Sequence, residues 1–417
     1  MSLKRKLRKN WGLLDMSYNL WNDCPKVPIT ELLSFIVDNR GKTVPTAEKG
    51  HKLIATNCVT NNTLFPVYEK VRYLSEETYQ NWFRAHPLPG DILFVNKGTP
   101  GRVCMVPDPV DFCIAQDMIA LRADDSKVYN KYLFAVLRSN VIQQQIYNTN
   151  VGDVIPHFKK QFMDQLLIPV PDRKIQEAIG DLYYTLSYKT EINKKINDNL
   201  QQLAQSYFQE LFVDKANPEW TTGTISDLGA VVGGSTPSKA KPEYYTESGI
   251  AWITPKDLSI NKSKFISHGE NDITDLGLKN SSATIMPEGT VLFSSRAPIG
   301  YIAIAAGEVT TNQGFKSVVP KPEIGTPFVY FFLKHNLPVI EGMASGSTFK
   351  EVSGSTMKNI PATIPDVETL ARFNDFCTPI FAQQRILEEQ SQSLAALRDN
   401  LLPKLMSGEI DVSDIQL

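Results

Sequence analysis

The sequence contains one domain written twice. The segment "GDILFVNKGTPGRVCMV" (90–106) matches "GTVLFSSRAPIGYIAIA" (289–305), and four further blocks recur in the same order in both halves. The longest, "VGDVIPHFKKQFMDQLLIPVPD" (151–172), aligns without gaps to "SGSTFKEVSGSTMKNIPATIPD" (345–366), at a constant offset of 194 residues. A period of this length is far too long for a solenoid repeat. The chain is therefore predicted to hold two copies of a whole domain, each with the segment that follows it.

The block at 289–305 contains a lone cation between two apolar runs. Val291–Phe293 and Tyr301–Ile304 predict short buried strands, and residues 294–300 predict the turn between them. Arg296 stands in this turn, and Lys97 holds the same place in the first copy. A cation repeated at one loop position suggests a binding role. The alternative is an ordinary solvated residue, because turns are commonly exposed.

About 40 residues with a helical pattern follow each copy. Apolar residues there recur at alternating steps of four and three, which is typical of a coiled-coil seam. An amphipathic helix on a globular core is the alternative, but the length and the repetition of the pattern favour the coiled coil. Pro379 predicts a bend or a restart in the second helix. The predicted seam consists of Ile175, Ile179, Leu182, Leu186, Ile196, Leu200, Leu203, Phe373, Phe376, Leu387, Leu394, Leu397 and Leu401.

The order of these parts predicts an architecture. The first helix leaves domain one and enters domain two, so a second helix packed on it must run back antiparallel. Forty helical residues span roughly 60 Å. We predict an α+β (mixed α/β) fold with an approximate two-fold axis. Its parts are domain one with a basic N-terminal tail (1–172), the first helix (173–212), domain two (213–366), and the second helix with a C-terminal tail (367–417).

Composition excludes several classes of protein. The formal net charge is −2, so a nucleic-acid site would have to be a local patch. The five cysteines and five histidines form no CxxC, HExxH or clustered motif, which argues against a disulfide framework and against a metal site. No run approaches 18 apolar residues and no signal peptide is recognisable, so we expect a cytoplasmic protein with no membrane partner.

Two similar heads on a rod suit the reading of two separated half-sites on double-stranded DNA, since one helical turn of DNA advances roughly 34 Å. Because the heads differ in sequence, the half-sites should differ too. Small polar loops with cations supply suitable contacts for bases and phosphates, although solvated turn chemistry is the alternative for each one. The candidate DNA-binding residues are Lys42, Thr43, Asn57, Asn61, Lys97, Thr99, Arg102, Lys159, Lys160, Ser235, Thr236, Lys239, Lys256, Ser294, Ser295, Arg296 and Lys350.

Signals of catalysis are missing from the sequence. "GKT" at 41–43 lacks the earlier glycine of a P-loop, because position 36 is isoleucine. "PDRKIQE" (171–177) faintly resembles a nuclease motif, but it leads into the first helix and its duplicate reads "PDVETLA". We interpret it as a junction between domain and helix, and we predict that the chain has no catalytic residues.

Two further stretches, "GGSTPSK…YY…GIAWITPKDLS" (233–259) and "LAALRDNLLPKLMSGEI" (394–410), are distinctive. Together with the duplicated blocks they resemble the DNA-specificity subunits of type I restriction–modification systems, over essentially the whole chain. The resemblance implies two target recognition domains that read a split, asymmetric DNA site, joined by an antiparallel pair of long helices.

The resemblance also implies partners. Two methyltransferase subunits, docked on the helices and adjoining faces, would bring S-adenosylmethionine and methylate adenine in each half-site. Restriction and translocase subunits, which use ATP and Mg²⁺, would cleave unmodified DNA. The chain itself would be a subunit without catalysis and without a cofactor.

Two other functions stay open at this point. A protein-binding scaffold with two heads and no DNA partner would fit the nearly neutral charge. A modification enzyme complete in itself is disfavoured, since no cofactor-binding motif is recognisable.

Overall fold

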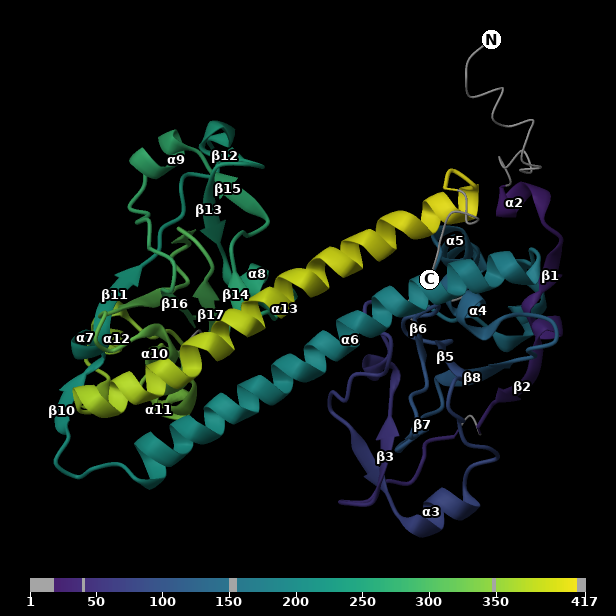
Figure 1. Ribbon diagram of the computed structural model, residues 1–417, viewed down its shortest axis with the longest axis horizontal. Coiled ribbons are helices and arrows are strands. Elements are labelled where there is room, and N and C mark those ends of the chain that lie inside the picture. The colour runs from purple at the N-terminus through teal and green to yellow at the C-terminus, as the bar shows by residue number, and fades with distance from the viewer. Residues whose placement is uncertain (1–18, 40–41, 150–155, 347–349, 411–417) are drawn as a thin grey trace. The chain divides into compact units, whose positions relative to one another are not determined.

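A computed structural model describes residues 19–39, 42–149, 156–346 and 350–410 (Figure 1). The predicted basic tail at 1–18 and the end of the predicted C-terminal tail, 411–417, lie outside them. The chain forms two compact units. Unit 1 comprises Met1–Asn193 with Gln390–Leu417, and unit 2 comprises Lys194–Glu389. Each unit combines sheets with helices, which confirms the predicted α+β class.

Unit 1 is built on a four-stranded antiparallel sheet in the order β2-β8-β5-β6, with a smaller sheet β4-β3-β7 and a two-stranded ribbon β1-β9. Its strands are β1 (Lys26–Pro28), β2 (Leu33–Val37), β3 (His51–Ile54), β4 (Arg72–Leu74), β5 (Ile92–Val95), β6 (Val103–Met105), β7 (Phe112–Ile114), β8 (Met118–Ala123) and β9 (Leu167–Pro169). Its shorter helices are α2 (Leu20–Asp23), η1 (Ile29–Leu32), η2 (Thr56–Cys58), α3 (Glu76–Asn81), α4 (Asn130–Leu137), α5 (Asn140–Thr149) and η3 (Lys160–Gln165).

Unit 2 is built on a five-stranded sheet, β11-β19-β16-β17-β14, with a smaller sheet β12-β15-β13-β18 and a ribbon β10-β20. Its strands are β10 (Thr221–Thr224), β11 (Gly229–Gly233), β12 (Tyr245–Thr246), β13 (Ile250–Ile253), β14 (Phe265–Ile266), β15 (Asn271–Ile273), β16 (Val291–Ser295), β17 (Ile299–Ala305), β18 (Thr310–Thr311), β19 (Lys316–Pro320) and β20 (Pro361–Ile364). Its shorter helices are α7 (Ile225–Leu228), η5 (Pro242–Tyr244), α8 (Pro255–Ile260), α9 (Asp275–Lys279), α10 (Thr326–His335), α11 (Leu337–Gly342) and α12 (Gly354–Lys358).

The main sheet of unit 2 repeats that of unit 1 and adds β14 at one edge. Strands β11, β19, β16 and β17 take the places of β2, β8, β5 and β6, and α10 follows as α4 does. The matched blocks 90–106 and 289–305 become the antiparallel pairs β5–β6 and β16–β17. The internal duplication predicted from the sequence is confirmed.

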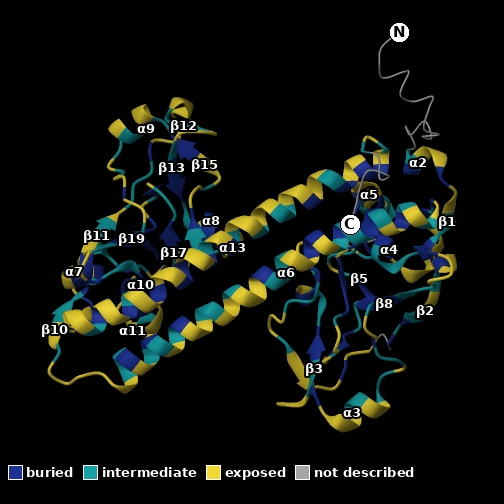
Figure 2. Cartoon of the chain, in the orientation of Figure 1, coloured by how far each residue is buried: buried dark blue, intermediate teal, exposed yellow. Residues whose placement is uncertain are grey.

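The main sheets are covered on both faces, and strands β5 and β16 are buried along their whole length (Figure 2). In unit 1, Phe94 packs with α4 on one face, while Leu93 packs with Ile54 and the smaller sheet on the other. The side chains of Tyr132–Leu137 in α4 are all buried. A helix that is apolar all round must lie between two layers, and Ile179 belongs to the core cluster that covers α4.

Two long helices, α6 (Arg173–Gln209) and α13 (Val367–Ser407), are each divided between the units, and a π-helical turn, η4 (Glu210–Asp214), extends the first. Within unit 1, Asn193 Nδ2 donates to Gln390 Oε1 at 2.8 Å, and the Arg398 guanidinium lies 5.6 Å from the ring centre of Tyr183. Later residues of α6 thus contact earlier residues of α13, so the two stretches run antiparallel.

The same direction holds within unit 2. Asn197 Nδ2 donates to the Gln384 carbonyl at 3.3 Å, and the rings of Tyr207 and Phe373 lie 5.9 Å apart. Each unit therefore contains an antiparallel pair formed by one stretch of α6 and one of α13, as the sequence predicted.

The predicted seam is right in part. Ile179, Leu186, Phe373 and Leu387 are buried, and Ile175, Leu182, Leu200, Leu394 and Leu401 are half-buried. Phe376 is 38 % exposed, but the centre of its ring lies 4.6 Å from the ring centre of Tyr207, where the two helices are in contact.

The seam prediction is wrong at three positions. Ile196, Leu203 and Leu397 are 40 %, 52 % and 47 % exposed, and Ala204 and Arg398 are buried beside the last two. A straight α-helix drifts by about 20° per heptad from a strict seven-residue repeat, so an extrapolated stripe leaves the contact after a few turns.

Of the bend or restart predicted at Pro379, the restart does not occur. Helix α13 is continuous through this residue. Proline removes one backbone hydrogen bond of the helix, but Cys377, Ile380 and Phe381 around it are buried in the core of unit 2. Packing on this core holds the helix where its own hydrogen bonding is interrupted.

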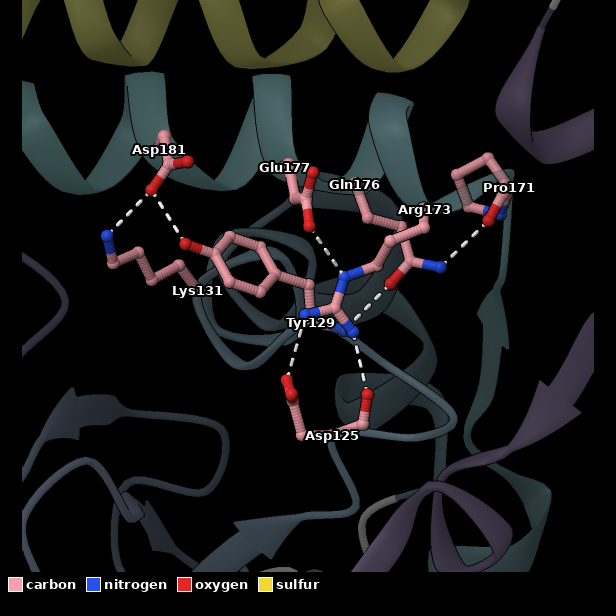
Figure 3. Close-up of polar contacts among 8 residues, drawn as sticks. All are labelled: Asp125, Tyr129, Lys131, Pro171, Arg173, Gln176, Glu177 and Asp181. Carbon is pink, nitrogen blue, oxygen red and sulfur yellow. Dashed lines mark hydrogen bonds and ion pairs between the residues drawn. The ribbon is translucent and has the colours of Figure 1, made fainter.

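The start of α6 is fastened to unit 1 by polar contacts (Figure 3). Asp181 accepts hydrogen bonds from Lys131 Nζ at 2.6 Å and from the Tyr129 hydroxyl at 2.8 Å, and Arg173 pairs with Asp125 at 2.9 Å. Burial alone would raise the pKa of Asp181, but the hydrogen bonds from Lys131 and Tyr129 lower it. The segment "PDRKIQE" is therefore a junction between domain and helix, as predicted.

Lys264 is buried against the stretch of α13 that belongs to unit 2. Lys264 is 8 % exposed, its Nζ donates to Gln384 Oε1 at 2.5 Å, and the same Nζ lies 4.0 Å from the ring centre of Phe381. Burial lowers the pKa of Lys264 from the usual 10.5 to about 7. The charged form is disfavoured because water is removed from it.

We expect Lys264→Met to stabilise the chain at pH 7, because it removes this charge from the interior. The unfolded wild-type chain binds the proton more tightly than the folded chain between pH 7 and 10.5, so the wild type gains stability as the pH rises through that window. The advantage of the variant should therefore shrink between pH 7 and 9. Urea unfolding at several pH values measures it, with the exposed Lys279→Met as control. An advantage that is constant or grows with pH would contradict the assignment.

Candidate nucleic-acid interface

Lys97, the lone cation of unit 1, lies just after the end of strand β5. Asn96, which stands between Lys97 and the strand, donates its N–H to the Asp117 carbonyl at 3.1 Å and accepts the Phe158 N–H on its carbonyl at 2.8 Å. Lys97 then forms a β-bridge with His157. The segments 96–98 and 156–158, which are distant in sequence, are thus held side by side at the end of the main sheet.

This arrangement brings three predicted cations together. Lys97, Lys159 and Lys160 line one pocket of about 410 Å³, and Lys160 forms an ion pair with Asp38 at its edge. Asp117 is the other acidic residue of the lining. Within the described lining, the three lysines outnumber the two carboxylates, so this part of the pocket is a local basic patch on a chain of nearly neutral charge.

Unit 2 repeats the geometry with different side chains. The Val352 N–H donates to the Ser295 carbonyl at 3.0 Å, as the Phe158 N–H does to Asn96 in unit 1. Arg296 Nη1 lies 3.4 Å from one oxygen of Glu351, and Lys316 Nζ lies 3.5 Å from the other. Arg296 therefore occupies the same position in unit 2 as Lys97 does in unit 1, as the sequence predicts. Lys350, the residue before this glutamate, is exposed.

The prediction that Ser294 and Ser295 contact DNA is wrong. Strand β16 runs on through both residues, and both are fully buried. The Ser294 hydroxyl donates to the Pro298 carbonyl at 2.8 Å, and that of Ser295 donates to the Gly314 carbonyl at 3.1 Å. These hydroxyls hold the turn together and are not available to a ligand.

Other candidates lie at the same end of each main sheet. Thr99 and Arg102 belong to the loop between β5 and β6, and Arg102 is exposed. Exposed Lys42 and Thr43 follow β2, while Ser235 and Thr236 follow β11. The Thr236 hydroxyl is bonded to Gln313 just before β19.

Four candidates are not brought into these clusters by any contact of the described residues. Asn57 Nδ2 donates to the Glu69 carbonyl at 2.5 Å, and Asn61 Oδ1 accepts the Val103 N–H at 2.8 Å. Both asparagines thus brace loops of unit 1. Lys256 in α8 pairs with Glu270 at 2.6 Å beside the smaller sheet, and Lys239 is an exposed loop residue.

Sequence reasoning missed several residues of the clusters. Asn39, Asn96, Gln116 and His157 line the pocket of unit 1, and Lys316 flanks Arg296 through Glu351. A signal for one of these, His157, was available, because the gap-free block aligns it with Glu351 beside the repeated cation.

Among the residues that the structure describes, no three His, Cys, Asp or Glu side chains are grouped so as to hold a metal ion. In the same residues, no helix is long and apolar enough to cross a membrane.

Comparison with known proteins identifies the family. The model of the type I restriction modification DNA specificity domain matches residues 42–202 and again 217–404, which together make up most of the chain. The two matches follow the two copies seen in the sequence and in the sheets.

Individual relatives agree with this match. The specificity subunit of the type I restriction enzyme MjaIX from Methanocaldococcus jannaschii is 39 % identical over 194 residues, which is 44 % of this chain and 45 % of that relative. The HindI specificity subunit of Haemophilus influenzae is 23 % identical over 401 residues, covering 77 % of this chain and 86 % of that one.

A solved structure shares the fold. The crystal structure of the type I restriction–modification S subunit from M. genitalium aligns over 94 % of this chain and 99 % of its own, with a TM-score of 0.60 and 17 % identity. The chain belongs to the specificity subunits of type I restriction–modification systems, the members of these enzyme complexes that carry no catalysis of their own.

Proposed function

We propose that the chain reads a bipartite, asymmetric DNA site, one half with each unit. The observation that carries this proposal is the repeated cationic sheet end, Lys97 with Lys159 and Lys160 in unit 1 and Arg296 with Lys316 in unit 2. Lysine and arginine at loop ends neutralise phosphates and contact base edges. Because equivalent positions carry different side chains, the two half-sites have different sequences.

The long helices set the distance between the half-sites in this proposal. The 37 residues of α6 and the 41 of α13 give helices of roughly 55–60 Å at 1.5 Å per residue. That length exceeds one turn of DNA, about 34 Å. A fixed spacer between the half-sites follows from it.

The same helices are proposed to dock the partner subunits. Ile196, Leu203, Ile386 and Leu397 are large apolar side chains left between 40 % and 56 % exposed on α6 and α13. Exposed apolar side chains on helices favour burial against another protein. We assign this role to two methyltransferase subunits that bring S-adenosylmethionine, with restriction subunits using ATP and Mg²⁺. The complex would act on DNA in the cytoplasm.

A protein-binding scaffold with two heads is the second candidate, and the net charge of −2 is the observation in its favour. The two functions differ in how they respond to salt. Duplex DNA binding weakens steeply as salt rises, with a slope set by the number of phosphates neutralised.

A pair of substitutions on neighbouring residues tests the DNA function. Arg296→Ala should lower the affinity for cognate duplex roughly three- to tenfold and reduce the salt slope by about 1. Glu351→Gln should raise the affinity, because it removes the carboxylate that pairs with Arg296. Fluorescence anisotropy across a salt series measures both effects. If neither variant changes affinity or slope, Arg296 is not in the interface; if the wild type shows no salt-dependent binding, the scaffold is favoured.

A further inference from the structure

The basic pocket of unit 1 also gathers amide side chains from three strands. Asn39 lies two residues after β2, Asn96 directly follows β5, and Gln116 lies two residues before β8. The sheet order β2-β8-β5, with antiparallel pairing, places these three strand ends next to one another. All three residues line the pocket of about 410 Å³ that carries Lys97, Lys159 and Lys160.

Each amide has one buried polar atom with no hydrogen-bond partner among the described residues. These atoms are Asn39 Nδ2, Asn96 Oδ1 and Gln116 Oε1. The orientation of Asn39 is fixed, because its Oδ1 accepts the Arg84 N–H at 3.1 Å and leaves Nδ2 as the free donor. Asn96 is only 7 % exposed, and its backbone N–H and carbonyl are both engaged. Buried polar atoms in native proteins are nearly always paired with protein groups or with water, so three such atoms lining one pocket are available to a ligand that displaces water.

The ligand must offer both a donor and an acceptor. In the major groove adenine presents the N6 amino group as donor and N7 as acceptor, and amide side chains pair with both at once. Guanine presents acceptors at N7 and O6, and would leave the two amide oxygens of Asn96 and Gln116 unpaired. Thymine presents one acceptor and a methyl group.

We propose that Asn39, Asn96 and Gln116 are specificity-determining residues of unit 1, and that their pocket takes the major-groove edge of an adenine in the first half-site. The one N6–H that the Watson–Crick pair leaves free is shared between the amide oxygens of Asn96 and Gln116, Asn39 Nδ2 donates to N7, and the surrounding lysines hold the flanking phosphates. This inference rests on the proposed DNA-reading function.

Unit 2 carries different groups at the corresponding place. Ser295 stands where Asn96 does, and its hydroxyl is already bonded to the Gly314 carbonyl at 3.1 Å. Gln313, which aligns with Gln116, is exposed and bonded to Thr236. The amide pocket therefore belongs to the first half-site alone, and the two heads differ in chemistry at the same structural position.

The test is a selection from duplexes with randomised positions, using the full chain in its complex. Gln116→Met and Asn39→Leu remove the hydrogen-bonding atoms while keeping similar volume. Gln116→Met removes an orphaned buried oxygen, so its thermal midpoint should not fall. Asn39→Leu also removes the acceptor of the Arg84 N–H, so its thermal midpoint should fall somewhat, and its base preference is compared well below that midpoint. The exposed Gln144→Met on α5 is the matched control. We expect each pocket variant to lose preference for adenine at one position of one half-site, roughly five- to hundredfold, with the salt slope and the other half-site unchanged.

The possible results distinguish a failure of the pocket assignment from a failure of the DNA-reading function. A wild type that selects a two-part site, with pocket variants that keep every preference, overturns the assignment of these amides. Loss of preference at a base other than adenine, or equally in both halves, also overturns it. A wild type that selects no sequence at all overturns the DNA-reading function itself, and the pocket assignment with it.

Discussion

Replacing Lys97, Lys159 and Lys160 together by alanine should weaken binding of cognate duplex roughly 10- to 100-fold at low salt and reduce the salt slope by about 3. The three lysines share one pocket at the end of the main sheet of unit 1, and among the residues that the structure describes only Lys160 is paired with a carboxylate. Each lysine that is removed no longer neutralises a phosphate, so that phosphate keeps its condensed counterions when the protein binds. Affinity should fall for all sequences, since phosphate contacts position the protein and carry no sequence information.

The control for this prediction has the same change in charge. Lys174, Lys194 and Lys195 are exposed on α6, and none of them lines the pocket. Their triple alanine variant loses three positive charges but should retain most of the affinity, because only long-range attraction changes. Equal losses in the two triple variants, measured by anisotropy from 50 to about 300 mM salt, would assign the binding to general charge and not to this sheet end.

Gly180→Ala should destabilise unit 1 by about 1–3 kcal/mol, although alanine is the better helix former. Gly180 lies in α6 where the helix crosses α4, and a β-carbon there would lie 2.6 Å from the backbone nitrogen of Tyr132 and 2.9 Å from the carbonyl carbon of Lys131. Backbone atoms cannot move aside as a side-chain tip can. The substitution must therefore push the long helix away from the core of unit 1 and disturb the contacts of Asp181 as well (Figure 3).

Gly342→Ala is the matched control, since it also lies in a helix, α11, and a β-carbon there meets nothing within 4 Å. This variant should be neutral or gain up to about 1 kcal/mol from helix propensity alone. Urea unfolding of both variants measures the difference. A stabilising effect of Gly180→Ala would contradict the close packing of α6 on α4.

Much of the fold could be predicted because the duplication supplies an internal comparison. A single occurrence of "GTVLFSSRAPIGYIAI" leaves the strands ambiguous, but two copies with apolar runs on both sides of a polar turn point to the same hairpin. The end of the strand could not be placed. Ser294 and Ser295 look like turn residues, yet the Ser295 N–H pairs with the Gly314 carbonyl, a partner that the local sequence does not indicate.

The long helices were predictable in extent but not in their contacts. The observed bounds, 173–209 and 367–407, lie close to the predicted ones because Gly180, Pro379 and Pro403 are the only glycines and prolines inside these stretches. The buried face, in contrast, depends on how far the helix rotates relative to its partner. This is why Leu203 and Leu397 were misplaced while Ile179 and Phe373 were not.

The candidate site was predictable only where charge marked it. Lys97 and Arg296 stand out as cations inside apolar blocks, and the gap-free alignment added Lys159, Lys160 and Lys350 nearby. Asn39 and Gln116 are ordinary polar residues beside strands, and their importance comes from burial without a partner. Such a property depends on the packing of three strands that are distant in sequence.

The most direct test of the account is the sequence of the DNA that the complete complex selects from a pool of duplexes with a long randomised region. Two different heads joined by helices of fixed length predict two short, dissimilar conserved blocks separated by a constant number of unspecified base pairs. A single contiguous block, two identical blocks, or blocks with a freely varying gap would contradict it.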